Sequence, residues 1–107
     1  MESQLEKIKE VQKEAWNKSS AGWKKWDDIV MEFLKPMSDE MIRMLRLKDD
    51  DTVLDVATGT GEPGLTIASI LKNGKVTGVD LSEKMLAVAE ENKRKRGIKN
   101  FETICSI

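Results

Sequence analysis

The sequence predicts an α/β protein in which a helical first part is followed by a parallel sheet of the form β-α-β-α-β. Up to Leu47, apolar residues recur every three to four positions, which is the period of an amphipathic helix. From Thr52 onward, short runs rich in β-branched residues alternate with helical stretches. Such short connections between strand and helix require parallel strands with right-handed crossovers.

Residues 1–50 are expected to form about three helices that act as a cap or lid. The first helix extends to about Trp16, and the polar segment 17–20 is expected to interrupt it. A serine of that segment can cap the second helix. This helix is expected to end at Pro36, because a proline ring disfavours helix at the residue before it. A third, short helix is expected to end near Leu47.

Residues 51–107 are expected to hold three strands joined by two helices. The first strand is too continuously apolar to be half exposed, so we expect it to be buried on both faces. Ser82 is expected to cap the second of the two helices, and Gly97 to end it. The expected strand order is 3-2-1, as in one half of a Rossmann-like fold. The three strands are expected at residues 52–57, 75–80 and 100–107.

The composition excludes several classes of function. The net charge of -1 provides no overall field for nucleic acid or for an anionic membrane, and the basic run 93–96 is interpreted as a solvated helix end. Cys105 is the only cysteine and histidine is absent, so neither an internal disulfide nor a metal site is expected. The chain has no signal peptide and no apolar run near the roughly 18 residues that span a bilayer, so we expect a cytoplasmic protein without membrane insertion.

Three glycines directly after the first strand form the pattern G-x-G-x-x-G, at Gly59, Gly61 and Gly64. Between a strand and a helix this pattern indicates a loop that binds a nucleotide or nucleoside. Gly59 permits the tight turn, Gly61 is expected to let the backbone approach a ligand, and Gly64 lets the helix lie close to the sheet. The alternative is a plain turn from strand to helix.

Two carboxylates suggest which ligand this loop binds. Asp80 ends the second strand about 20 residues beyond the loop, where a carboxylate can accept hydrogen bonds from both hydroxyls of a ribose, although it can also stabilise the next helix N-terminus. Asp55 lies inside the first strand, where its charge would repel a pyrophosphate and attract a cation. We therefore expect S-adenosylmethionine rather than a nicotinamide dinucleotide. Asp55 can alternatively be a buried acceptor for nearby amide groups.

The segments Val53-Leu54-Asp55-Val56-Ala57-Thr58-Gly59-Thr60-Gly61 and Gly78-Val79-Asp80-Leu81-Ser82-Glu83-Lys84-Met85-Leu86 carry a family resemblance. They resemble the first and second motifs of class I S-adenosylmethionine-dependent methyltransferases, particularly the ubiquinone/menaquinone biosynthesis C-methyltransferases. That family usually has glycine where Ala57 stands. The resemblance implies a cofactor site at Asp55, Ala57, Thr58, Gly59, Thr60, Gly61, Asp80, Leu81 and Met85.

The helical first part also resembles the family, in which segments before the first motif fold over the cofactor. Trp23 is the candidate lid residue and is added to the cofactor site, although tryptophans at helical spacing are most simply core residues. Met85 on an apolar helix face can likewise be a core residue.

The resemblance also implies what this chain lacks. In the family the sheet continues past a third strand, and later segments contact the methyl acceptor, so we expect a truncated chain with no identifiable catalytic residue. The acceptor is expected to be a small molecule, and the unpaired edge of the first strand is expected to join two copies into a homodimer. The alternatives are a non-catalytic oligomerising or cofactor-binding module and an NAD(P)-dependent oxidoreductase fragment.

Overall fold

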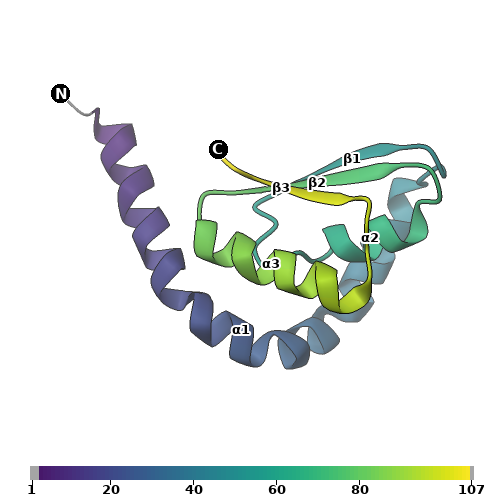
Figure 1. The fold of residues 1–107 in the computed structure, drawn as a ribbon, viewed down its shortest axis with the longest axis horizontal. Helices are drawn as coiled ribbons and strands as arrows, with labels where there is room; N and C mark the ends of the chain where they lie inside the picture. Colours follow the sequence, from purple (N-terminus) through teal and green to yellow (C-terminus); the bar gives the residue numbers. More distant parts are fainter. Residues whose placement is uncertain (1–2, 107) are drawn as a thin grey trace.

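A long helix and a three-stranded parallel sheet with two crossover helices make up the protein (Figure 1). The computed structural model describes residues 3–106, so Met1, Glu2 and Ile107, the last residue of the expected third strand, lie outside the described residues. Among the described residues, no helix combines the length and the apolar character that crossing a membrane requires. The elements are α1 (Gln4–Leu45), β1 (Thr52–Val56), α2 (Gly64–Ile70), β2 (Lys75–Asp80), α3 (Glu83–Arg96) and β3 (Phe101–Cys105).

The sheet has the order β1-β2-β3, and both pairs of strands are parallel. This confirms the predicted order 3-2-1 and the Rossmann-like β-α-β-α-β half. Ser82 caps α3 by accepting a hydrogen bond from the amide of Met85 at 3.2 Å, and Gly97 ends the helix in the left-handed conformation, as predicted. Because the strands are parallel, their carboxyl ends meet at one edge, where the glycine loop and the start of α3 also lie.

The core lies between the sheet and the helices α2 and α3. The Phe101 ring of β3 is 1% exposed, and Leu65 of α2 and Val76 of β2 are fully buried beside it. The amide group of Asn100 donates to the carbonyls of Ala68 and Gly74, both at 2.9 Å, which ties the start of β3 to the end of α2 and to the turn before β2.

The opposite face of the sheet is open, which corrects the expectation that the first strand is buried on both faces. Leu54 is 63% exposed and Val56 is 62% exposed. Both crossover helices lie on the same side of the sheet (Figure 1), so alternate residues of β1 face solvent despite their apolar character. The apolar run correctly predicted a strand, but its apolar residues do not all lie in the core.

Helix α1 is continuous, which corrects the expectation of three separate N-terminal helices. Segment 17–20 does not interrupt the helix, and its serine hydroxyls bond to the preceding turn instead of capping a new helix: Ser19 donates to the carbonyl of Ala15 at 2.9 Å and Ser20 to that of Asn17 at 2.7 Å. The helix also continues through Pro36 and ends only at Arg46, which is left-handed (φ 51°). It curves along the side of α3 that faces away from the sheet, and its N-terminal part rises past the carboxyl ends of the strands (Figure 1).

The variant Pro36→Ala is expected to stabilise the second half of α1. Alanine restores a backbone N–H donor inside the helix and removes the ring that crowds the preceding turn, which contributes about 1–3 kcal/mol locally. Hydrogen exchange of the amides in residues 37–45 should slow accordingly. In the exposed Met37→Ala variant, which leaves the backbone donors unchanged, the exchange should hardly change. Equal exchange rates in the wild type and Pro36→Ala would contradict this account.

Candidate functional site

A cavity of about 500 Å³ opens where the glycine loop, the end of β2 and the start of α3 meet helix α1. This volume lies in the range of small-molecule sites. All the predicted cofactor-binding residues except Asp55 and Gly61 line it. The full lining consists of Gln12, Trp16, Trp23, Met31, Ala57, Thr58, Gly59, Thr60, Glu62, Asp80, Leu81 and Met85.

The Asp80 carboxylate lies at the carboxyl end of β2 and faces the glycine loop. Its Oδ2 accepts a hydrogen bond from the Gly59 amide at 2.8 Å, and its Oδ1 accepts one from the Ser82 amide at 3.0 Å. These two bonds fix the carboxylate against the cavity although the residue is only 9% exposed. Each carboxylate oxygen has a second lone pair, so the group retains acceptor capacity for two ligand hydroxyls.

Two glycines of the loop serve the contact between loop and core. Gly61 has a φ of 110°, and a Cβ built there lies 2.6 Å from Cδ1 of Leu65. The space that the missing side chain leaves is therefore filled by α2, which corrects the expectation that Gly61 opens the way for a ligand. A Cβ on Gly64 lies 2.7 Å from the Asp55 carboxylate and 2.9 Å from the Phe101 ring, so Gly64 permits the close approach of helix and sheet that the motif predicted.

Ala57 adopts the left-handed conformation with a φ of 58°. This conformation is unfavourable for a residue with a Cβ and open to glycine. It gives a physical reason for the glycine that the resembling family usually has at this position.

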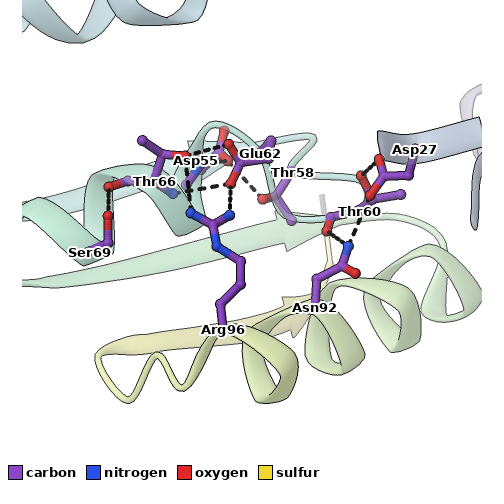
Figure 2. Close-up of polar contacts among 10 residues, drawn as sticks. Asp27, Asp55, Thr58, Thr60, Glu62, Thr66, Ser69, Asn92 and Arg96 are labelled. Carbon is purple, nitrogen blue, oxygen red and sulfur yellow. Dashed lines mark hydrogen bonds and ion pairs between the residues drawn. The ribbon is translucent and has the colours of Figure 1, made fainter. Parts of the chain in front are cut away.

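Asp55 makes the contacts of a structural acceptor. Its Oδ2 accepts hydrogen bonds from the Thr58 hydroxyl at 2.7 Å and from the Gly64 amide at 3.1 Å (Figure 2). Burial raises the pKa of the Asp55 carboxyl, the two hydrogen bonds oppose this effect, and the nearby Glu62 and Asp80 carboxylates reinforce it. Since Asp55 lies outside the cavity lining, it reaches the cavity only through Thr58, and these bonds match the alternative interpretation of this residue.

Two substitutions of Asp55 distinguish the stability that its hydrogen bonds contribute from the effect of its charge. Asp55→Ala leaves the Gly64 amide and the Thr58 hydroxyl without their acceptor and is expected to lower the free energy of unfolding by about 1–3 kcal/mol. Asp55→Asn keeps an acceptor oxygen and is expected to change the free energy of unfolding by less than about 1 kcal/mol at neutral pH. Urea denaturation of the two variants measures both effects, and equal losses would contradict the proposed hydrogen bonds.

The pH dependence of the same experiment tests the charge. A raised pKa means that the folded chain binds the Asp55 proton more tightly than the unfolded chain, so this contribution is complete below the usual aspartate value of about 4. It is lost as the pH rises through the raised pKa. The free energy of unfolding of the wild type should therefore decrease as the pH rises from about 4 through the raised pKa of Asp55. Asp55→Asn has no carboxyl at this position and should not show this decrease.

The cavity wall carries negative charge and no cationic side chain. Besides Asp80 it includes Glu62, whose carboxylate accepts hydrogen bonds from the Thr66 amide at 3.1 Å and from the Arg96 guanidinium (Figure 2). No lysine or arginine lines the cavity. Within residues 3–106, no cluster of three or more His, Cys, Asp or Glu side chains is arranged to hold a metal. Since Arg96 forms an ion pair with Glu62, the negative charge of this wall comes mainly from Asp80, and it favours a ligand that carries positive charge.

Helix α1 provides the rest of the wall through residues that sequence reasoning missed, apart from Trp23. Gln12, Trp16 and Trp23 lie on one face of the helix, and the two indole rings are 6.3 Å apart between centroids. Trp16 is 41% exposed and Trp26 is 52% exposed, which corrects the interpretation of the tryptophans as core residues. The spacing of these residues indicates a shared face only if the helix is continuous, so the interruption expected at residues 17–20 concealed it.

A buried polar junction joins α1 to the loop and to α3. The Asp27 carboxylate accepts hydrogen bonds from the Thr60 hydroxyl at 2.7 Å and from the Asn92 amide group at 3.1 Å (Figure 2). Sequence analysis identified Thr60 but neither Asp27 nor Asn92. No local signal distinguishes these two residues from the many other polar residues of their helices.

A glycine loop after the first strand of a parallel sheet and a carboxylate after the second define a Rossmann-like domain that binds a nucleoside. Residues 47–106, more than half of the chain, match the family described as "Methyltransferase domain". The chain belongs to this family, which confirms the predicted class.

Similar proteins agree with this assignment. A demethylmenaquinone methyltransferase from Porphyromonas gingivalis is 43% identical over 60 residues, which are 55% of this chain and 24% of that protein. A release factor glutamine methyltransferase from Fusobacterium nucleatum is 33% identical over 66 residues, which are 62% of this chain and 19% of that protein. The chain thus spans about a quarter or less of the length of these two relatives.

Solved structures show the same fold. A SAM-dependent methyltransferase from Aquifex aeolicus has a TM-score of 0.60 at 34% identity, over 65% of this chain and 38% of that one. Coclaurine N-methyltransferase, bound to N-methylheliamine and SAH, has a TM-score of 0.64 at 30% identity, over 67% of this chain and 21% of that one. Together with the family match, these structures indicate S-adenosylmethionine (SAM) as the cofactor, as predicted; S-adenosylhomocysteine (SAH) is its demethylated product.

Proposed function

We propose that the cavity is the S-adenosylmethionine site of a methyltransferase and that this chain supplies its cofactor-binding part. The position of Asp80 carries the proposal, because its carboxylate lies on the cavity wall beside the glycine loop and can accept hydrogen bonds from both ribose hydroxyls. Leu81 and Met85 follow it along the wall and would contact the adenine. Glu62 also lines the cavity, where its ion pair with Arg96 compensates its charge, so its contribution would be that of a hydrogen-bond acceptor.

The loop is held in shape for this ligand by residues behind the wall. Asp55 fixes the Thr58 hydroxyl and the Gly64 amide, and Thr58 lines the cavity. We therefore assign Asp55 an indirect role: it fixes the conformation in which the main chain of Gly59 faces the ligand. A site that is formed before binding loses less entropy when the ligand enters.

We propose a small molecule as the methyl acceptor. The lining that α1 contributes includes Trp16, Trp23 and Met31, which form an apolar surface suited to a small, weakly polar acceptor beside the cofactor rather than to a charged polymer. Transfer from a sulfonium requires chiefly that nucleophile, methyl group and sulfur are aligned. No residue of the cavity is assigned as a catalytic acid or base.

Calorimetric titration of the chain with SAM, SAH and NAD tests the ligand. We expect SAM and SAH to bind and NAD not to bind, because the match to the methyltransferase family and the similar structure with bound SAH indicate this cofactor. Binding of NAD with the higher affinity would instead favour the oxidoreductase alternative. Binding of none of the three would favour a module without a cofactor.

We also propose that two copies associate through the edge of β1. Among the described residues, β2 is the only strand paired with β1, so the other edge of β1 has free backbone groups. Leu54 and Val56 of the same strand are exposed. Sedimentation equilibrium is expected to show a dimer, which Leu54→Lys should weaken. A monomer at high concentration would refute this association without affecting the cofactor proposal.

A further inference from the structure

Asp27 is the only residue of α1 that is buried. Its exposure of 8% is low for a carboxylate on a helix whose other described residues are all at least partly exposed. A buried carboxylate is unfavourable unless hydrogen bonds compensate for the lost water. Its partners therefore indicate where α1 is held.

Asp27 is satisfied by neutral donors from two other elements. Its Oδ1 accepts the hydrogen bond from Thr60 and its Oδ2 the one from Asn92, and the Asn92 amide group also donates to the Thr60 carbonyl at 2.9 Å (Figure 2). No cationic side chain within residues 3–106 forms an ion pair with Asp27. The three residues form a closed triangle between α1, the glycine loop and α3.

Helix α1 has further polar contacts with α3. The Asn17 side chain accepts hydrogen bonds from the partly buried Ser82 hydroxyl and from the exposed Lys84 amide, and further contacts are ion pairs. Lys13 pairs with Glu83 at 3.4 Å and Lys24 with Glu91 at 3.0 Å, and both pairs are open to solvent. Exposed ion pairs of this kind contribute little, because water and salt screen them. Much of the apolar surface of α1 faces away from the protein, with Phe33 84% exposed and Ile29 62% exposed. Of these attachments, the Asp27 triangle is the one that also reaches the glycine loop.

This attachment lies directly behind the cavity. Trp23 and Met31 are each one helical turn from Asp27, and both line the cavity. Thr60 lines it as well while its hydroxyl bonds to Asp27. The position of the helix wall and the conformation of the loop are thus joined directly by the Thr60–Asp27 hydrogen bond and indirectly through Asn92.

We propose that Asp27 is a positioning residue that holds α1 over the cofactor through Thr60 and couples the docking of this helix to cofactor binding. This inference rests on the proposed S-adenosylmethionine site. A ligand that contacts both the loop and the α1 wall can make all its contacts only when α1 is docked against the loop. If fewer molecules have α1 docked, the apparent affinity for the ligand is lower. Asp27 itself need not contact the ligand.

The variants Asp27→Ala and Thr60→Val remove the two ends of the hydrogen bond, and the valine nearly preserves the shape of threonine. Thr60→Ser changes the same cavity-lining residue but keeps the hydroxyl that bonds to Asp27, so it is compared directly with Thr60→Val. Asp28→Ala removes the neighbouring, exposed carboxylate of the same helix. Calorimetry should show SAM and SAH each binding about tenfold more weakly to Asp27→Ala and Thr60→Val, and with wild-type affinity to Asp28→Ala. Thr60→Ser should bind both ligands more tightly than Thr60→Val does. The double variant should lose little more than either single one.

Tryptophan fluorescence provides a readout that loss of stability alone would not change. All three tryptophans lie in α1 and the chain has no tyrosine, so the emission reports on this helix. In a Trp26→Phe background only the cavity residues Trp16 and Trp23 emit. Saturating SAH should change their emission in the wild type and in Thr60→Ser. The change should be smaller in Asp27→Ala and Thr60→Val, even at temperatures where circular dichroism shows these variants folded.

Three results would overturn the proposal. One is wild-type affinity and fluorescence response in folded Asp27→Ala and Thr60→Val. The second is a loss confined to SAM, which would show that Asp27 acts through its charge on the sulfonium and not by positioning α1. The third needs no ligand. We expect the amides of residues 20–35 to exchange faster in Asp27→Ala than in Asp28→Ala, and equal exchange in the two variants would contradict the proposal. If the wild type binds neither SAM nor SAH, the proposed function and its coupling fail, and hydrogen exchange still decides whether Asp27 anchors α1.

Discussion

Asp80→Ala is expected to reduce the affinity for S-adenosylmethionine by about a hundredfold or more. The variant would remove the two charge-assisted hydrogen bonds that we propose Asp80 accepts from the ribose, each worth about 1.5–3 kcal/mol. It also removes the acceptor of the Gly59 amide and thereby frees the loop that the ligand must meet. Both effects act in the same direction, so this substitution should have the largest effect on binding of any at the site.

Calorimetry well below the melting temperature measures this loss, with circular dichroism to confirm the fold. The fold needs checking because the Gly59 and Ser82 amides lose their acceptor, which is expected to lower stability by about 1–3 kcal/mol for each buried amide. Asp80→Asn keeps one acceptor oxygen and should give an intermediate loss of about tenfold. Asp50→Ala removes an exposed carboxylate and should bind as the wild type does. Wild-type affinity in folded Asp80→Ala would refute the ribose contact.

Phe101→Ala is expected to lower the free energy of unfolding by about 3–5 kcal/mol. The ring is 1% exposed and lies against two glycines, so close that a Cβ on Gly64 or Gly78 would approach it to 2.9 or 2.8 Å. Backbone on two sides cannot move in to fill the space that the ring leaves, so the cavity term is expected to be large. Since domains are stable by about 5–15 kcal/mol in total, the variant should be close to unfolding.

Urea denaturation of Phe101→Ala and Ile104→Ala provides the test. Ile104 lies on the same strand but faces the open side of the sheet and is 48% exposed, so its truncation should have an effect of less than about 1 kcal/mol. Similar losses in the two variants would show that the open face is covered in solution, for example in the dimer proposed above. Sedimentation of the same samples distinguishes this outcome from an error in the position of the core.

The sequence by itself determined the features that depend on short segments. The strands are marked by β-branched runs, and α3 by Ser82 at its start and Gly97 at its end, because capping and turn conformation depend on a few neighbouring residues. The place of Asp80 beside the glycine loop also follows from the sequence, since consecutive parallel strands bring their carboxyl ends to one edge of the sheet. The family and its cofactor followed from the same two motifs.

Only the tertiary structure decided which partner each ambiguous residue has. The serines of segment 17–20 can cap a helix or bond within it. In the structure they bond within α1, which is continuous and brings Trp16 to the cavity. Asp27 is one of many acidic residues in the sequence, and its burial exists only because Thr60 and Asn92 meet it from segments more than 30 residues away. Contacts between distant segments depend on how the elements are placed in space, and local residue patterns do not determine that placement.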